Sequence, residues 1–139
     1  MEEAERRIEE LPILTFILRT HDVLYFGHMI EHVSIPVSDV KKAKEFYTKA
    51  LAPLGYEEKH DWGSAIGFME GGHTSFIVSE EKKFAPTHIA FLAGSKEAVD
   101  AFHKEALQAG GKDNGEPGYR KDYSPGYYAA FIHDADGNN

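Results

Sequence analysis

The chain has 139 residues, of which 42% are hydrophobic and 27% charged, a composition typical of one small globular domain. Its 23 acidic and 15 basic residues give a net charge of −8, which excludes the basic surface that nucleic-acid binding requires. Cysteine is absent and the early apolar run, residues 11–18, is too short to cross a membrane. We therefore expect a cytoplasmic protein that binds neither nucleic acid nor membranes.

Residues 1–28 are predicted to be an N-terminal extension made of a helix and a strand. Residues 1–11 have the pattern of a charged amphipathic helix, and their acidic character does not suit a signal peptide. Residues 13–19, Ile-Leu-Thr-Phe-Ile-Leu-Arg, have the strongest strand character in the sequence. The alternative is a leader that packs somewhere without completing any sheet.

The main domain is predicted to begin with a strand, a helix and a hairpin. Residues 30–37 are rich in β-branched side chains, which indicates a strand. Ser38 or Asp39 then offers an N-cap oxygen for a helix with apolar residues at three- and four-residue steps. Residues 62–69 and 74–79 alternate in polarity around a Gly-Gly turn, which indicates a hairpin.

A second strand and helix are predicted further along the chain. Residues 87–93 have strand composition, and Ser95 can cap a helix that Gly110 and Gly111 end. Residues 112–126 are rich in glycine and polar residues, and we expect them to form a long loop. A strand at 127–133 and a turn at 134–139 follow.

The two predicted units are repeats of each other. An offset of 56 residues, without a gap, keeps the strand and the helix of both units in phase. The identical pairs are His32 with His88, Phe46 with Phe102, Ala50 with Ala106, Leu51 with Leu107 and Gly55 with Gly111. We therefore divide the domain, residues 29–139, into half-repeats of about 29–84 and 85–139. The repeat requires one more strand after the final turn, and residues 13–19 could replace it.

These features resemble single-domain members of the vicinal oxygen chelate superfamily, the glyoxalase/bleomycin resistance protein/dioxygenase-like proteins. The resemblance spans residues 29–139, and the residues that carry it are Ile30–Val33, Phe46–Gly55, His88–Phe91, Val99–Phe102, Ala109–Gly118, Tyr127–Phe131 and Asp134–Asn139. It implies an α+β fold in which two βαβββ-type repeats form a cupped mixed sheet with helices on the outside. The last strand would be missing here.

The resemblance also implies a divalent metal ion, such as zinc, nickel, manganese or iron, inside the cup. His32 and His88 match the family's first-strand ligand positions, and neutral imidazoles suit such ions. Relatives place a glutamate ligand just beyond the final turn, where this sequence has ended, so we expect weak binding or an unexpected third ligand. The alternative for each histidine is an ordinary hydrogen-bonded role in its strand.

Polar and aromatic residues of the predicted loop, and of the start of the strand predicted after it, are candidates for substrate binding. They are Asn114, Arg120, Tyr123, Tyr127 and Tyr128. The planar fork of Arg120 could hold a carboxylate or another anion, although the loop could equally pack only for stability. The remaining histidines of the domain are expected on the surface, with His103 solvated on its helix.

The resemblance implies a metal-assisted lyase or isomerase of glyoxalase type that acts on a small oxygenated substrate. One alternative is a non-catalytic protein of the same superfamily that binds a small molecule of the antibiotic type. Another is a truncated or engineered scaffold without intact activity. In each case the expected partner is a small molecule, and the family also allows a homodimer. Fold alone does not decide among these functions.

Overall fold

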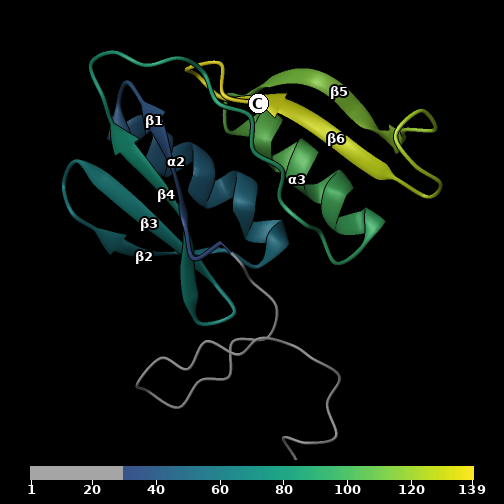
Figure 1. The fold of residues 1–139 in the computed structure, drawn as a ribbon, viewed down its shortest axis with the longest axis horizontal. Helices are drawn as coiled ribbons and strands as arrows, with labels where there is room; N and C mark the ends of the chain where they lie inside the picture. The colour runs from purple at the N-terminus through teal and green to yellow at the C-terminus, as the bar shows by residue number, and fades with distance from the viewer. Residues whose placement is uncertain (1–29) are drawn as a thin grey trace, which may run out of the picture. The chain divides into compact units, whose positions relative to one another are not determined.

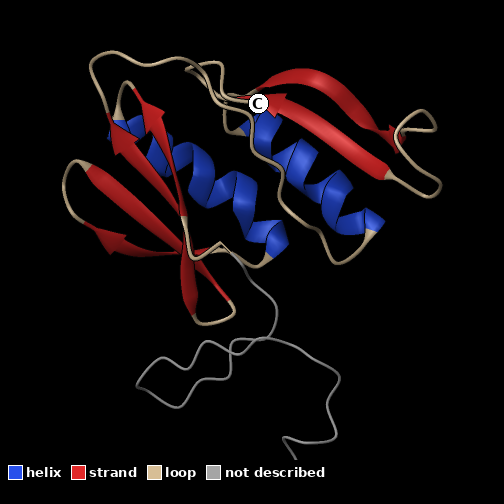
Figure 2. Cartoon of the chain, viewed as in Figure 1, coloured by secondary structure: helices blue, strands red, loops and turns tan. Residues whose placement is uncertain are grey.

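The computed structural model describes residues 30–139, whose elements are shown in Figures 1 and 2. The helix and strand predicted within residues 1–28, and with them the replacement strand at 13–19, lie outside the described part of the chain. The unit from His32 to Asn139 contains two helices and two sheets, so the α+β class predicted from the sequence is confirmed. None of the described helices has the length and apolar character needed to cross a membrane.

The first half forms a mixed sheet of four strands in the order β1-β4-β3-β2. Its elements are β1 (Val33–Val37), α2 (Val40–Leu51), the 3-10 turn η1 (Ala52–Leu54), β2 (Glu57–Asp61), β3 (Ala65–Glu70) and β4 (His73–Glu80). β1 runs parallel to β4, with Val33 opposite Phe76, and the other pairs are antiparallel. The predicted strand, helix and Gly-Gly hairpin are confirmed, and β2 is an additional edge strand.

Helix α2 begins where Asp39 caps it. The Asp39 carboxylate accepts hydrogen bonds from the amides of Lys41 and Lys42, both at 3.1 Å. Ser38, the other candidate cap, instead donates its amide to the carboxylate of Asp136 at 2.9 Å. The helix thus starts with its first free amides satisfied, which stabilises its N-terminal end.

The second half contains α3 (Lys96–Gln108), β5 (Lys112–Tyr119) and β6 (Tyr128–His133). Ser95 caps α3 by accepting a hydrogen bond from the Ala98 amide at 3.1 Å, as predicted. β5 and β6 form an antiparallel two-stranded sheet. The prediction of a loop over residues 112–126 is therefore wrong for its first half. The register of β5 shifts on either side of Gly115, and these irregularities hide the alternation that marks a strand in a sequence.

The strand predicted at residues 87–93 does not form. Within the described residues, the backbone of this segment forms hydrogen bonds with the backbone of a single residue, Asn139. The Ile89 amide donates to the Asn139 carbonyl at 2.9 Å, and the Asn139 amide donates to the Thr87 carbonyl at 3.0 Å. The rest of the segment runs extended without a ladder. Strand composition favours an extended chain, but a strand also needs a partner edge.

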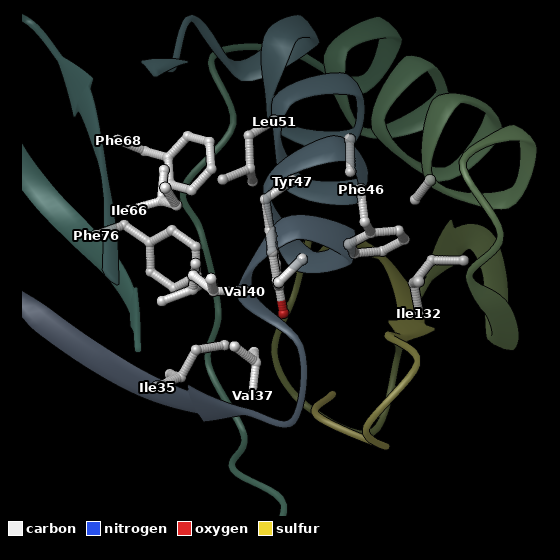
Figure 3. Packing of buried hydrophobic residues seen from close by; sticks show 14 residues of the cluster. Ile35, Val37, Val40, Phe46, Tyr47, Leu51, Ile66, Phe68, Phe76 and Ile132 are labelled. Carbon is white, nitrogen blue, oxygen red and sulfur yellow. The ribbon is translucent and has the colours of Figure 1, made fainter. Parts of the chain in front are cut away.

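The core lies between the four-stranded sheet and α2, and it continues to β6 (Figure 3). Phe46 and Tyr47 meet edge-on with ring centroids 4.9 Å apart, and Tyr47 meets Phe76 at 5.1 Å. Phe68 and Phe76 are almost completely buried, and Ile132 brings β6 into the same cluster. Burial of each large apolar side chain contributes about 1.5–3 kcal/mol, so this cluster is the main stabilising element of the domain.

The turn at residues 134–139 ties the second half to β1 and α2. Asp134 is buried and accepts a 2.7 Å hydrogen bond from the hydroxyl of Tyr47. The Asn138 side chain donates to the carbonyl of Pro36 at 3.1 Å and accepts from the Thr87 amide at 2.8 Å. These bonds fix the position of residues 87–89, and therefore of His88, relative to the turn.

Candidate ligand cavity

An open cavity of about 750 Å³ lies over the two-stranded sheet of the second half. Five of the residues singled out from the sequence line it, namely His88, Asn114, Arg120, Tyr123 and Tyr127. They come from the extended segment, from β5 and from the loop between β5 and β6. The fold thus brings residues from well-separated parts of the second half to one open space.

The alternation of side chains along each extended segment decides which of them face the cavity. His88 and Ala90 line it, whereas Ile89 and Phe91 pack against the hydrophobic core. In β6, Phe131 lines the cavity and the next residue, Ile132, is buried in the core. Successive side chains point to opposite faces of an extended chain, so one face of each segment stabilises the fold and the other is open to a ligand.

A chain of side-chain hydrogen bonds orients His88. The Asn114 amide group donates to Oδ1 of Asn139 at 3.2 Å, and Nδ2 of Asn139 lies 2.9 Å from Nδ1 of His88. Because an amide nitrogen only donates, Nδ1 of His88 must accept, and the proton of the neutral ring is on Nε2. His88 therefore offers the cavity a hydrogen-bond donor.

The described residues do not form a complete metal centre. His88 is the histidine that lines the cavity, and its Nδ1 is hydrogen-bonded to the Asn139 side chain. Within residues 30–139, moreover, no group of three or more His, Asp or Glu side chains is placed to hold a metal. His32 is exposed and precedes β1. The described residues thus hold no complete ligand set.

Arg120 supplies the cation of the cavity. Its backbone amide donates to the Tyr127 carbonyl at 2.8 Å, which closes the loop between β5 and β6. Its guanidinium donates through Nη2 to the Glu116 carbonyl at 2.6 Å and lies over the ring of Phe131, 5.4 Å from the centroid. The side chain is half-buried. Backbone and ring together hold the guanidinium in one orientation.

Tyr128 is not part of this cavity. It points to the opposite face of β6, where its hydroxyl donates to the Asp100 carboxylate of α3 at 2.7 Å. This hydrogen bond raises the pKa of Tyr128 above its ordinary value of 10.0. Tyr128 also lines an adjoining cavity of about 420 Å³, which shares wall residues such as His88 and Phe131 with the first cavity and also includes Phe102. Tyr128 thus braces a helix against β6.

The expectation that His103 is solvated is wrong. Its side chain is buried, and Nε2 lies 2.8 Å from the Asp113 carboxylate of β5. The hydrogen bond from His103 is the main reason why the pKa of Asp113 lies below its ordinary value of 3.8, and the Gly115 amide adds to it. The sequence did not reveal this burial, because charged residues surround His103 on α3 and its partner strand β5 was predicted to be part of a loop.

The cavity residues that were not singled out from the sequence include Glu116, Phe131 and Asn139. Phe131 lies in the strand predicted at residues 127–133, and the sequence of that strand does not indicate which of its two faces lines a cavity. Asn139 belongs to a predicted turn and acquires its role only by contact with His88. Comparison of the two half-repeats could have pointed to Asn139, because the turn at residues 134–139 directly precedes the position at which the repeat requires one more strand.

Known proteins resemble the chain over most of its length. A family model for the glyoxalase/bleomycin resistance protein/dioxygenase superfamily matches residues 29–139. The crystal structure of a glyoxalase/bleomycin resistance protein from Albidiferax ferrireducens T118 is 28% identical, with a TM-score of 0.68 over 80% of this chain and 93% of that one. An uncharacterized protein of Bacillus subtilis (strain 168), YqjT, is 26% identical over 77% of this chain and 91% of its own.

A likeness of fold alone extends to a named enzyme. The structure of a lactoylglutathione lyase from Agrobacterium tumefaciens has a TM-score of 0.61 over 82% of this chain and 91% of that one. Its sequence identity is 17%, so the likeness concerns the backbone arrangement and not the site residues.

Proposed function

Because the chain belongs to the glyoxalase/bleomycin resistance protein/dioxygenase superfamily, we propose that it binds a small oxygenated molecule in the cavity over β5 and β6. The observation that carries this proposal is the convergence of hydrogen-bond donors and aromatic rings on one open space. Arg120 and His88 provide the donors, and Tyr123, Tyr127 and Phe131 provide the rings. Small-molecule sites combine a few converging polar groups with apolar walls in this way.

The size and the walls of the cavity support a small ligand. Its volume of about 750 Å³ falls in the range of cavities that hold drug-sized molecules. Tyr123 and Tyr127 form a tilted ring pair with centroids 5.2 Å apart at its edge, and both are exposed to solvent. An oxygenated molecule with an apolar part would cover these rings while its oxygens accept hydrogen bonds from the donors.

Fragment titration of ¹⁵N-labelled protein tests the proposal. Neutral oxygenated fragments, such as catechol, dihydroxyacetone and benzamide, should shift the backbone amides of Ala90, Asn114 and Phe131. Tyr127→Ala should weaken the fragments that bind, because it removes a wall of the cavity. Tyr128→Phe is the matched control, since this ring faces α3, and it should leave the affinities unchanged. Shifts confined to other surfaces would refute the cavity as the site.

A metal-assisted lyase or isomerase of glyoxalase type is the second candidate. What favours it is that His32 and His88 fall at equivalent positions of the sequence repeat, which the resemblance to the family marks as ligand positions. Calorimetric titration with zinc, nickel and manganese, compared with the His32→Ala/His88→Ala double variant, tests this candidate. Metal affinity that is the same in both proteins would rule out the shared site. The homodimer that the family allows stays a prediction for analytical ultracentrifugation.

A further inference from the structure

We propose that the ligand of this cavity is an oxyanion with a planar apolar body, and that Arg120 is the residue that selects it. The inference rests on the proposed function and goes further, because it names the charge and the shape of the ligand. Its basis is the way in which the fold holds the guanidinium of Arg120 and leaves its charge available.

The guanidinium is held in place before any ligand arrives. One of its nitrogens, Nη2, donates to the Glu116 carbonyl at 2.6 Å, and its plane lies over the ring of Phe131. A guanidinium has five N–H donors, and within residues 30–139 a hydrogen bond forms from one of its nitrogens, so several donors remain for a ligand. A donor group that is already oriented loses little conformational freedom on binding.

Two glycines make room for this position. A Cβ atom at Gly115 would lie 2.9 Å from Cδ2 of Phe131 and 3.2 Å from Nη2 of Arg120, and one at Gly118 would lie 3.4 Å from Nη1. Gly115 also has φ of +153°, a backbone conformation that other residues rarely adopt. The irregular register of β5 at Gly115 therefore serves to seat the guanidinium against the sheet.

The charge of Arg120 has no counter-ion among the residues that the structure describes. No described carboxylate lies within salt-bridge distance of the guanidinium, although the chain carries a net charge of −8. Asp113 is near enough for Arg120 to lower its pKa slightly, but the carboxylate accepts hydrogen bonds from His103 and the Gly115 amide. Glu116 also lines the cavity, and only its carbonyl contacts Arg120. A bound oxyanion would supply the absent counter-charge.

The walls around Arg120 decide the shape of the ligand. The ring of Phe131 lies beneath the guanidinium, and the Tyr123 and Tyr127 rings stand at the edge of the same cavity. A planar body can stack against these rings while its oxyanion meets the guanidinium fork. Carboxylates and phosphates share this chemistry, and the experiment below separates them.

The test compares probes of nearly equal shape and different charge. Benzoate, phenyl phosphate and the neutral benzamide are titrated into the wild-type chain and into Arg120→Met, Arg120→Lys and Lys121→Met. We expect the anions to bind more tightly than benzamide by about tenfold to a hundredfold, the factor that a hydrogen-bonded charge provides. Arg120→Met should abolish this preference, weakening the two anions by more than it weakens benzamide, and the benzamide binding that remains reports that the cavity is still formed.

The two other variants make the result specific. Arg120→Lys should keep part of the preference, because it keeps the charge but loses the fork. Lys121→Met removes an exposed cation from the neighbouring position and should keep the full preference. The stronger of benzoate and phenyl phosphate identifies the kind of oxyanion.

Benzamide that binds as tightly as benzoate, benzoate that does not bind, or a preference that survives in Arg120→Met would overturn the inference. If one of these results is obtained and neutral fragments still bind in the cavity, the proposed function remains valid and the inference about the oxyanion alone is overturned. Fragments that bind only elsewhere would instead overturn the proposed function.

Discussion

The hydroxyl of Tyr47, on α2, donates a 2.7 Å hydrogen bond to the buried carboxylate of Asp134, which lies 87 residues later in the sequence. Asp134 also accepts from the Asn138 amide at 2.8 Å, the Asn138 side chain at 2.8 Å and the Asp136 amide at 2.9 Å. Four donors thus surround one buried carboxylate. Burial, followed by the nearby Asp134 charge, raises the pKa of Tyr47 above its ordinary value. The phenol therefore keeps its proton and remains a donor.

Removal of the Tyr47 hydroxyl should destabilise the domain. We expect Tyr47→Phe to lower the free energy of unfolding by about 1.5–3 kcal/mol, because a buried carboxylate loses one of its donors. Urea denaturation measures this change. Tyr56→Phe is the control, since in the described part of the chain the Tyr56 hydroxyl has just one contact, a long hydrogen bond of 3.4 Å from the Ser75 hydroxyl. Equal effects of the two substitutions would contradict the role assigned to the bond with Asp134.

The stability of the domain should depend on pH through Asp113. The pKa of this carboxyl is lowered in the folded state from 3.8, first by the hydrogen bond from His103. The stability that the ionised Asp113 carboxylate contributes is therefore fully present above the ordinary pKa. This contribution is lost as the pH falls through the lower pKa of the folded state. The stability difference between the wild type and Asp113→Asn should shrink below pH 3.8. A stability difference that stays constant down to acid pH would contradict the prediction.

A methyl group at Gly111 should not be tolerated. A Cβ atom there would lie 2.8 Å from Cγ2 of Ile132, 2.9 Å from the Ala106 carbonyl oxygen and 2.9 Å from Cε2 of Phe46. These atoms belong to the core, so we expect Gly111→Ala to cost about 1–3 kcal/mol of unfolding free energy. Gly94→Ala meets no atom within 4 Å and should have little effect. Thermal unfolding of the two variants measures the contrast, and similar melting temperatures would refute it.

Hydrogen exchange should distinguish the paired from the unpaired part of residues 87–93. The Ile89 amide is bonded to the Asn139 carbonyl, whereas the Phe91 amide makes no backbone hydrogen bond within the described residues. We expect the Phe91 amide to exchange at least about tenfold faster than that of Ile35, its repeat equivalent, which lies in the ladder with Val78. Comparable protection of both amides would show that another segment pairs with Phe91.

The sequence alone determined the features that depend on near neighbours. Helices α2 and α3 could be predicted because their caps, Asp39 and Ser95, and their apolar periodicity lie within the same short segments. The β3–β4 hairpin follows in the same way from its two glycines. The repeat and the family resemblance marked His88 as a site candidate, and the composition of the following loop marked Asn114 and Arg120. These three residues line one cavity.

The tertiary structure alone decided which extended segments pair and which faces they bury. Residues 87–93 have strand composition but form no strand, and residues 112–119 have turn composition but pair with β6. In the same way, His103 is buried by the sheet that β5 completes, and Tyr128 points to α3 while Tyr127 faces the cavity. The physical reason is that strand pairing and burial are interactions between distant segments, and local composition does not encode which partner will be present.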